Sequence, residues 1–201
     1  MQIMYAPQGL SWKLRHNVVL RQVAMCIGVD AYMHTDDRRL LERVILPHVA
    51  GRSDFARILF VGCDWYTRGY ARFFEQREFW TMDVDPAKRR YGSDRHIADC
   101  VSRVDRHFGR GALDAVVCNG VFGWGLDERN AVERTFWAFR RVMRRGALFI
   151  LGWNDVPTLT PFPLEECRSL ALYAPYEFPP LRASRFMTTT PNRHTYAFYS
   201  R

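Results

Sequence analysis

The stretch RILFVGCDWYTRGY, residues 57–70, decides the fold that the sequence predicts. Its apolar run, residues 58–61, is typical of a strand that is buried on both faces of a parallel sheet. Gly62 then permits a tight turn, and aromatic residues recur at helical spacing over residues 66–74. In open α/β sheets a ligand binds beyond the carboxyl ends of the strands, where a helix begins. The stretch therefore predicts a ligand-binding turn, and an ordinary strand-to-helix turn is the alternative.

The composition is that of a globular chain. Its 201 residues are 48% apolar and 14% aromatic, which suits one domain with a sizeable core. No apolar run approaches the roughly 20 residues of a membrane span, and the first 25 residues lack the pattern of a signal peptide. We therefore expect a cytoplasmic protein without a membrane partner. Five scattered cysteines without a C-x-x-C pair indicate reduced thiols.

The charge leaves nucleic acid open as an alternative partner. The net charge is +8 and the pI is about 9.6, values that favour acidic partners. However, 27 of the 29 basic residues are arginines that are spread along the whole chain. The densest basic runs fall on predicted helices, where solvated faces are the simpler interpretation. A small-molecule substrate is therefore preferred, and the sequence carries no signal for an oligomeric state.

The region before the decisive stretch, residues 1–51, is expected to be a helical cap or lid within the same domain. It has no phosphate-loop pattern and only a loose helical periodicity over residues 12–25. A clearer helix begins at Asp36 and Asp37 and ends near Pro47, and its apolar face is expected to pack on the sheet. No linker separates this region from residues 52–201.

Acidic residues follow the next two predicted strands. Asp83 ends the strand of residues 79–82 and lies 21 residues after Gly62, near the spacing at which an acid binds a ribose in this architecture. Asp99 follows the short strand at residues 95–98 and could accept a hydrogen bond from an adenine amine. Helix capping is the alternative for both acids. His96 and Cys100 are four residues apart, but no further ligand has metal-site spacing, so no metal is predicted.

A glycine-rich aromatic loop follows the next predicted strand, residues 113–118. The loop NGVFGWG, residues 119–125, could approach a ligand closely while its aromatic rings cover it, or its rings could close the edge of the core. Asp127 is then expected to cap a helix over residues 128–145. A fifth strand over residues 147–151, a helix over residues 164–173 and a hairpin of residues 184–190 and 194–199 complete the chain.

This pattern predicts an α/β fold, Rossmann-like and doubly wound, with a mostly parallel seven-stranded sheet that ends in an antiparallel hairpin. It resembles the class I S-adenosylmethionine-dependent methyltransferase family over residues 54–201. The resemblance implies S-adenosylmethionine as cofactor and S-adenosylhomocysteine as product. It also implies which residues face each part of the ligands. Those at the methionine part, the ribose, the adenine, and the exit of the fourth strand that faces cofactor and substrate are, in chain order: Gly62, Cys63 and Asp64; Asp83 and Val84; Asp99 and Cys100; Asn119 and Gly120.

The chain departs from the family in the glycine loop. Phe60 stands where the family has an acid, and Asp64, Trp65 and Tyr66 replace the later glycines. Asp64 is therefore expected to make the contact with the methionine amino group. Because of this departure, an alternative is a protein that binds the adenosyl cofactor but does not catalyse methyl transfer.

The resemblance implies a methyltransferase that acts on a small molecule by in-line transfer. Four side chains follow the carboxyl ends of the first, fourth and fifth strands and are expected nearest the methyl group: Tyr66, Asn119, Trp124 and Asn154. RNA methylation is the alternative that the arginine content suggests. A dinucleotide oxidoreductase is disfavoured because the later glycines of G-x-G-x-x-G are absent.

Overall fold

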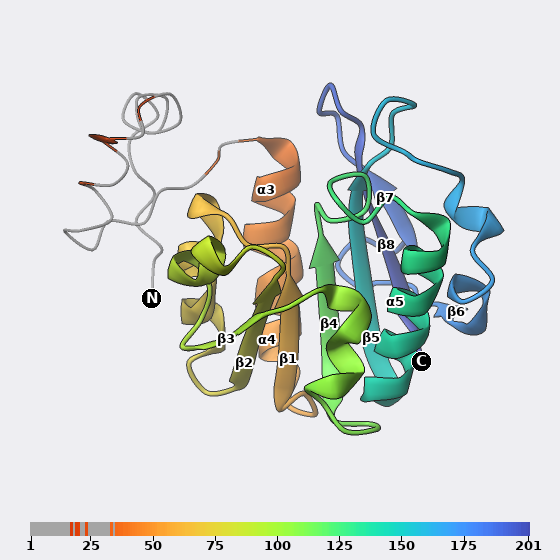
Figure 1. The fold of residues 1–201 in the computed structure, drawn as a ribbon, viewed down its shortest axis with the longest axis horizontal. Coiled ribbons are helices and arrows are strands. Elements are labelled where there is room, and N and C mark those ends of the chain that lie inside the picture. The colour runs from red at the N-terminus through yellow and green to blue at the C-terminus, as the bar shows by residue number, and fades with distance from the viewer. Residues whose placement is uncertain (1–16, 18, 21–22, 24–32, 34) are drawn as a thin grey trace.

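The computed structural model describes residues 35–201 together with residues 17, 19, 20, 23 and 33 (Figure 1). One mixed sheet runs through this part of the chain in the order β3-β2-β1-β4-β5-β8-β6, and β7 also pairs with β8. Strands β1 to β5 are parallel, and β8 is antiparallel to β5. The strands are β1 (Arg57–Val61), β2 (Glu78–Asp83), β3 (Arg95–Ala98), β4 (Leu113–Asn119), β5 (Met143–Asn154), β6 (Ala174–Pro175), β7 (Arg185–Met187) and β8 (His194–Ser200).

The predicted α/β fold with a mostly parallel sheet and a closing hairpin is confirmed. The sheet has eight strands rather than the seven expected, because the two-residue β6, which was not expected, pairs with the end of β8 at Tyr199 and Ser200. The pair of β7 and β8 is the predicted hairpin, and its connection, residues 188–193, includes Pro191.

Helices cover both faces of the sheet, as a doubly wound fold requires. One face carries a continuous helical segment made of α3 (Asp36–Leu40), the π-helical turn η1 (Leu41–Ile45) and α4 (Leu46–Gly51), together with η2 (Trp65–Phe74). The other face carries α5 (Arg129–Val142) and η4 (Val101–Arg106). Three short 3-10 turns complete the described elements: η3 (Pro86–Tyr91), η5 (Leu164–Glu166) and η6 (Leu170–Leu172).

The decisive apolar run is buried on both sides of the sheet. In β1, Ile58 and Phe60 pack into the core under α3 to α4, and Leu59 and Val61 pack into the core under α5. All four side chains are at most 2% exposed. This alternation explains why the run carries no polar residue, because neither face of a central parallel strand meets water.

Several predicted helix boundaries are wrong. The first helix does not end near Pro47 but continues to Gly51, and the π-helical turn η1 widens it just before the proline, which cannot donate a backbone hydrogen bond. Residues 66–74 form a 3-10 helix. The helix expected at 164–173 is two separate turns, η5 and η6.

The long helix of the second half is shorter than expected. Residues 128–145 were expected to be helical, but α5 ends at Val142 and β5 begins at once at Met143. Asp127 does not cap this helix, because its carboxylate accepts from the backbone N–H of Gly125 and Glu128 occupies the cap position.

The cap or lid role that the sequence suggests for residues 1–51 stays a prediction. Most of that region, including the periodicity over residues 12–25, lies outside the described residues. The described part, residues 36–51, packs into the core of the sheet through Leu41, Ile45, Leu46 and Val49.

Candidate functional site

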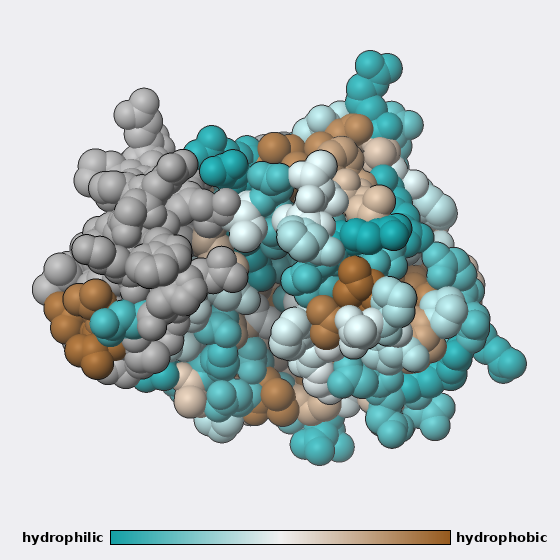
Figure 2. Space-filling view, turned by 90° about the horizontal axis from the view of Figure 1, so that it is seen from above, coloured by the Kyte–Doolittle hydropathy of each residue, from teal (hydrophilic) through white to brown (hydrophobic). Residues whose placement is uncertain are grey.

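A cavity of about 810 Å³ opens at the carboxyl ends of β1, β2, β4 and β5. Figure 2 looks onto this end of the molecule and shows a mostly hydrophilic surface, on which the brown groups of the described residues stay separate. All of the site residues predicted from the sequence line the cavity: Gly62, Cys63, Asp64, Tyr66, Asp83, Val84, Asp99, Cys100, Asn119, Gly120, Trp124 and Asn154.

The turn after β1 needs glycine. Gly62 has φ of +94°, and a Cβ atom there would lie 2.6 Å from the carbonyl oxygen of Asn119 and 2.8 Å from Cγ2 of Val121. Its backbone N–H donates to the carbonyl of Met82 over 3.0 Å. The turn is therefore pressed against the ends of β2 and β4, and the missing side chain lets these three strand ends meet.

Asp83 ties two of these strand ends together. Its Oδ2 accepts from the backbone N–H of Cys63 over 2.8 Å, and its Oδ1 accepts from the backbone N–H of Asp85 over 3.0 Å. A carboxylate offers about four lone pairs, so each oxygen keeps accepting capacity on the cavity side. The helix-cap alternative for Asp83 is not what the structure has, because Asp85 makes the capping bond of η3, to the backbone N–H of Ala87.

Asp64 is engaged within the protein. It caps η2 by accepting from the backbone N–H of Trp65, and Thr67 completes the capping box. Its other oxygen lies 2.7 Å from Nζ of Lys88 on η3. Burial opposes the charge of Lys88, but the hydrogen bond to Asp64 raises the pKa of the ammonium group. The ion pair therefore fixes the carboxylate of Asp64, which is one of the residues that replace the later glycines of the loop.

Asp99 also has partners of its own. Its Oδ2 lies 2.9 Å from Nε2 of His107, and its Oδ1 accepts from the backbone N–H of Cys100 and from Arg103. The hydrogen bond with His107 is the main cause that lowers the pKa of Asp99. The carboxylate is therefore ionised and held at the cavity wall. Asp99 does not cap η4, since Cys100 occupies the cap position without a side-chain bond.

The two aromatic rings of the loop after β4 lie in different surroundings. Phe122 is fully buried and packs edge-on against Phe162 in the core. Trp124 lines the cavity and is 60% exposed. Gly123 fixes the loop close to Leu159, whose carbonyl oxygen would lie 1.9 Å from a Cβ atom at Gly123. One ring therefore closes the core and the other lies at the mouth of the cavity.

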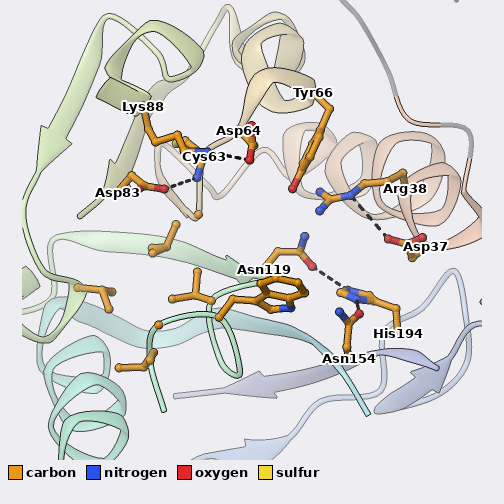
Figure 3. A pocket seen from close by; sticks show the side chains of 18 of the residues that line it. Asp37, Arg38, Cys63, Asp64, Tyr66, Asp83, Lys88, Asn119, Asn154 and His194 are labelled. Carbon is orange, nitrogen blue, oxygen red and sulfur yellow. Dashed lines mark hydrogen bonds and ion pairs between the residues drawn. The ribbon is translucent and has the colours of Figure 1, made fainter. Parts of the chain in front are cut away.

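A histidine that the sequence did not point to joins two of the predicted residues. His194 begins β8, and its Nε2 lies 3.0 Å from Oδ1 of Asn119 while its Nδ1 lies 2.7 Å from Oδ1 of Asn154 (Figure 3). Burial lowers the pKa of His194 to about 4. The imidazole is therefore neutral at physiological pH, and both of its nitrogens are occupied by amide groups.

The helix α3 adds two charged residues to the cavity wall. The Arg38 guanidinium lies 4.2 Å above the ring of Tyr66, and its Nε is 3.6 Å from a carboxylate oxygen of Asp37. Burial raises the pKa of Tyr66, so its hydroxyl stays protonated and can act as a hydrogen-bond donor. Arg38 is only 7% exposed.

The missed residues reach the cavity through tertiary contacts. Asp37 was read only as the start of a helix, and nothing in the sequence around Arg38 indicates that this turn of the helix lies beside Tyr66. His194 could have been found from the hairpin, because the antiparallel register of β5 and β8 places it opposite Asn154. A register prediction would have needed the fifth strand to extend to Asn154.

In the part of the chain that the structure describes, no group of three or more His, Cys, Asp or Glu side chains is arranged to hold a metal ion. Over the same residues, no helix has the length and apolar character that crossing a membrane requires.

No protein-family model and no curated protein matches the sequence. Solved structures do match the fold. The N-methyltransferase NodS from Bradyrhizobium japonicum WM9, in complex with S-adenosyl-L-homocysteine, is 12% identical with a TM-score of 0.57, over 83% of this chain and 93% of that chain. A TehB-like SAM-dependent methyltransferase from Corynebacterium glutamicum is 14% identical with a TM-score of 0.58, over 94% and 98%.

A third similar structure covers all of this chain and 92% of its own. It is the 1,6-didemethyltoxoflavin-N1-methyltransferase from Burkholderia thailandensis, with bound 1,6-didemethyltoxoflavin and S-adenosylhomocysteine, at 15% identity and a TM-score of 0.56. At these identities the likeness establishes the fold. The chain has the Rossmann-like fold of S-adenosylmethionine-dependent methyltransferases.

Proposed function

We propose that the protein is an S-adenosylmethionine-dependent methyltransferase that acts on a small molecule. The observation that carries this proposal is the hydrogen bond from the backbone N–H of Cys63 to the carboxylate of Asp83. This hydrogen bond joins the glycine turn and an accepting carboxylate in one wall of the cavity. The turn at Gly62 has no room for a side chain, and the carboxylate keeps free lone pairs. A cavity of about 810 Å³ is within the range of small-molecule sites.

The adenosine part of the cofactor fits the side of the cavity formed by β2 and β3. Asp83 would accept from the ribose hydroxyls with the lone pairs that Cys63 and Asp85 leave free. Val84 and Val101 line the same side and would lie against the faces of the adenine ring. Asp99, with Cys100 beside it, would accept from the adenine amine in addition to its bonds with His107 and Arg103.

The methionine part of the cofactor fits against the turn of residues 62–64. Gly62 and Cys63 present backbone there, and Gly120 adds the start of the loop after β4. Asp64 remains our candidate for the methionine amino group, because Trp65 and Lys88 use only part of its accepting capacity. The ion pair with Lys88 would then compete with that contact.

The reacting centre would lie among Tyr66, Asn119, Trp124 and Asn154. When bound, S-adenosylmethionine supplies an activated methyl group on a sulfonium. The residues of this chain would hold the acceptor in line with it and keep water away, with Trp124 at the mouth of the cavity. Tyr66 and Asn119 can donate hydrogen bonds to the acceptor, and neither is a base at neutral pH. The acceptor would therefore be a group that is nucleophilic without strong activation by the protein.

A small-molecule acceptor is preferred to RNA because several residues of the basic runs form ion pairs within the fold. Arg144 pairs with Asp114 and Asp54, Arg141 pairs with Asp105, and Lys88 pairs with Asp64. The Burkholderia thailandensis enzyme, which has a similar fold, was crystallised with the small molecule 1,6-didemethyltoxoflavin. Binding to RNA through phosphate contacts weakens steeply between about 50 and 200 mM salt. If the protein stays bound to RNA over this range, the binding does not rest on phosphate contacts alone.

Mass spectrometry of the purified, denatured protein tests the cofactor. We expect S-adenosylmethionine or S-adenosylhomocysteine to co-purify, or S-adenosylhomocysteine to bind in a calorimetric titration. Release of S-adenosylhomocysteine from S-adenosylmethionine in the presence of an acceptor pool then separates an enzyme from a protein that only binds the cofactor. Binding without any turnover across acceptor pools would favour the non-catalytic alternative.

A further inference from the structure

Two buried hydrogen-bond donors face the same part of the cavity without partners. They are Nη1 of Arg38 and Nδ2 of Asn119, and neither has a hydrogen-bond partner among the residues that the structure describes. Arg38 is 7% and Asn119 is 3% exposed. A buried donor that lacks an acceptor costs about 1–3 kcal/mol, and a charged one costs more. A ligand that supplies acceptor atoms would remove this cost.

We propose that Arg38 and Asn119 form a carboxylate-binding site in this cavity. Figure 3 shows that the guanidinium of Arg38 and the amide of Asn119 both point into the cavity, close to Tyr66. The two donors come from α3 and from the end of β4, which are far apart in the sequence. The inference rests on the proposed function for the identity of the second ligand, S-adenosylmethionine.

The charge around the two donors selects a carboxylate over a phosphate. Arg38 contributes one positive charge, and the carboxylate of Asp37 lies 3.6 Å from its Nε. His194 adds no positive charge, because burial lowers its pKa and keeps the imidazole neutral. A phosphate with nearly two negative charges would be repelled by Asp37, and among the described residues at the two donors it would meet the single charge of the guanidinium. A carboxylate with one charge matches the guanidinium.

The guanidinium of Arg38 is already held in place. Its cation–π contact with Tyr66 at 4.2 Å fixes one face, and the ion pair with Asp37 engages the Nε edge. This leaves the Nη1 side for a ligand. Because the side chain is fixed before binding, little rotamer entropy is lost when the carboxylate arrives.

His194 orients the amide of Asn119. A neutral imidazole has one N–H, so it can donate to only one of the two amide oxygens that approach it, and the other amide must turn its NH₂ group toward the ring. If Nε2 carries the proton, it donates to Oδ1 of Asn119, and Nδ2 of Asn119 is left for the cavity. Asn154 then donates to Nδ1. His194 is therefore a positioning residue, and its tautomer decides whether Asn119 offers a donor or an acceptor to the ligand.

The carboxylate could belong to the methyl acceptor or to the amino-acid end of the cofactor, and one set of titrations separates the two. S-adenosylhomocysteine carries a carboxylate, and 5′-methylthioadenosine lacks the amino-acid end. Acetate, benzoate and succinate serve as free carboxylate probes on protein loaded with S-adenosylhomocysteine, with benzamide as the neutral match for benzoate. The variants are Arg38→Met and Asn119→Leu. The matched control is Arg141→Met, at an exposed position of α5 that does not line the cavity.

Two results support the site. If the carboxylate is the cofactor's, Arg38→Met weakens S-adenosylhomocysteine at least tenfold and leaves 5′-methylthioadenosine unchanged. If it is the acceptor's, S-adenosylhomocysteine binds the variant as before, but a carboxylate probe that binds the loaded wild type is lost. Asn119→Leu follows Arg38→Met in either case, and Arg141→Met behaves as the wild type. The site is refuted if no carboxylate ligand distinguishes Arg38→Met and Asn119→Leu from the wild type.

Two measurements keep the test independent of folding and of the proposed function. Thermal unfolding shows whether each variant is folded, and Arg38→Lys keeps the charge while losing the fork, so it should restore only part of the binding. ¹⁵N NMR of His194 should show the Nε2–H tautomer, and an Nδ1–H tautomer would contradict the donor role of Asn119. If the wild type binds neither adenosyl ligand, the proposed function fails, and titration of the unloaded protein with the carboxylates still decides the site.

Discussion

The backbone N–H of Cys63 donates a hydrogen bond of 2.8 Å to Oδ2 of Asp83. The residue after the glycine turn of β1 is thereby fixed to the acid at the end of β2. The turn and the acid are consequently one structural unit, in which Gly62 supplies close approach and Asp83 supplies both the anchor and the acceptor for a ligand. A change in either residue is expected to alter both the stability and the shape of the cavity.

Replacement of Asp83 tests the anchoring role. Asp83→Ala removes the acceptor for the backbone N–H groups of Cys63 and Asp85. We expect a loss of about 1–3 kcal/mol in the free energy of unfolding, the usual cost of leaving such groups without partners. Urea unfolding measures it. Asp85→Ala, which removes only the cap of η3, should cost about 1 kcal/mol, and a loss for Asp83→Ala below that of Asp85→Ala would contradict the anchoring role.

Substitution of Gly62 tests the close approach of the strand ends. In Gly62→Ala the added Cβ would meet the carbonyl oxygen of Asn119 at 2.6 Å, and φ of +94° disfavours any side chain. We expect destabilisation of about 1–3 kcal/mol or more, from overpacking and strain together. Gly51→Ala is the matched control, because Gly51 lies at the end of α4 with no atom within 4 Å of the added Cβ.

Gly51→Ala should be neutral or stabilise by up to about 1 kcal/mol. Thermal and urea unfolding of both variants provide the comparison. Equal stability of Gly62→Ala and the wild type would contradict the close approach of the turn after β1 to Asn119.

Glu42 makes stability fall as the pH rises. It is 2% exposed, accepts a hydrogen bond of 2.9 Å from Tyr70, and has a pKa that burial raises to about 7 from 4.5. Between pH 4.5 and 7 the unfolded chain releases this proton before the folded chain does, so rising pH favours unfolding. We expect up to about 3 kcal/mol to be lost by pH 8, and Glu42→Gln to remove this loss. Urea unfolding from pH 5 to 8 is the measurement, and equal slopes for the two proteins would disprove it.

His194 has the opposite dependence. Burial lowers its pKa to about 4 from 6.5, so the unfolded chain takes up a proton first as the pH falls. The stability that neutral His194 provides is complete above pH 6.5 and is lost toward pH 4, by up to about 3 kcal/mol. His194→Gln should therefore be less sensitive to acid than the wild type. Since Glu42 acts in the opposite direction over part of this range, the Glu42→Gln variant should show the acid sensitivity most clearly, and its absence there would show that His194 titrates normally.

The sequence predicted the cavity wall that successive parallel strands provide. Gly62, Asp83, Asp99 and Asn119 each follow a strand, and parallel strands in one sheet end at the same edge, so their meeting follows from the order of elements alone. The hydrophobic run of β1 and the closing hairpin were likewise visible as local patterns.

The remaining parts of the site depend on contacts that no local pattern encodes. Arg38 reaches the cavity because α3 packs beside η2, and His194 reaches it through the antiparallel register of β8 with β5. The partner of Asp64 is Lys88, 24 residues away on another helical turn. Helix types were missed for a related reason: short segments over the sheet adopt 3-10 geometry, and aromatic spacing does not separate this from an α-helix.

Calorimetric titration of the wild type, Asp83→Ala and Asp85→Ala with S-adenosylhomocysteine tests the central claim most directly. The account predicts one-to-one binding to the wild type, at least tenfold weaker binding to Asp83→Ala and unchanged binding to Asp85→Ala. No binding to the folded wild type, or equal affinity for all three proteins, would contradict it.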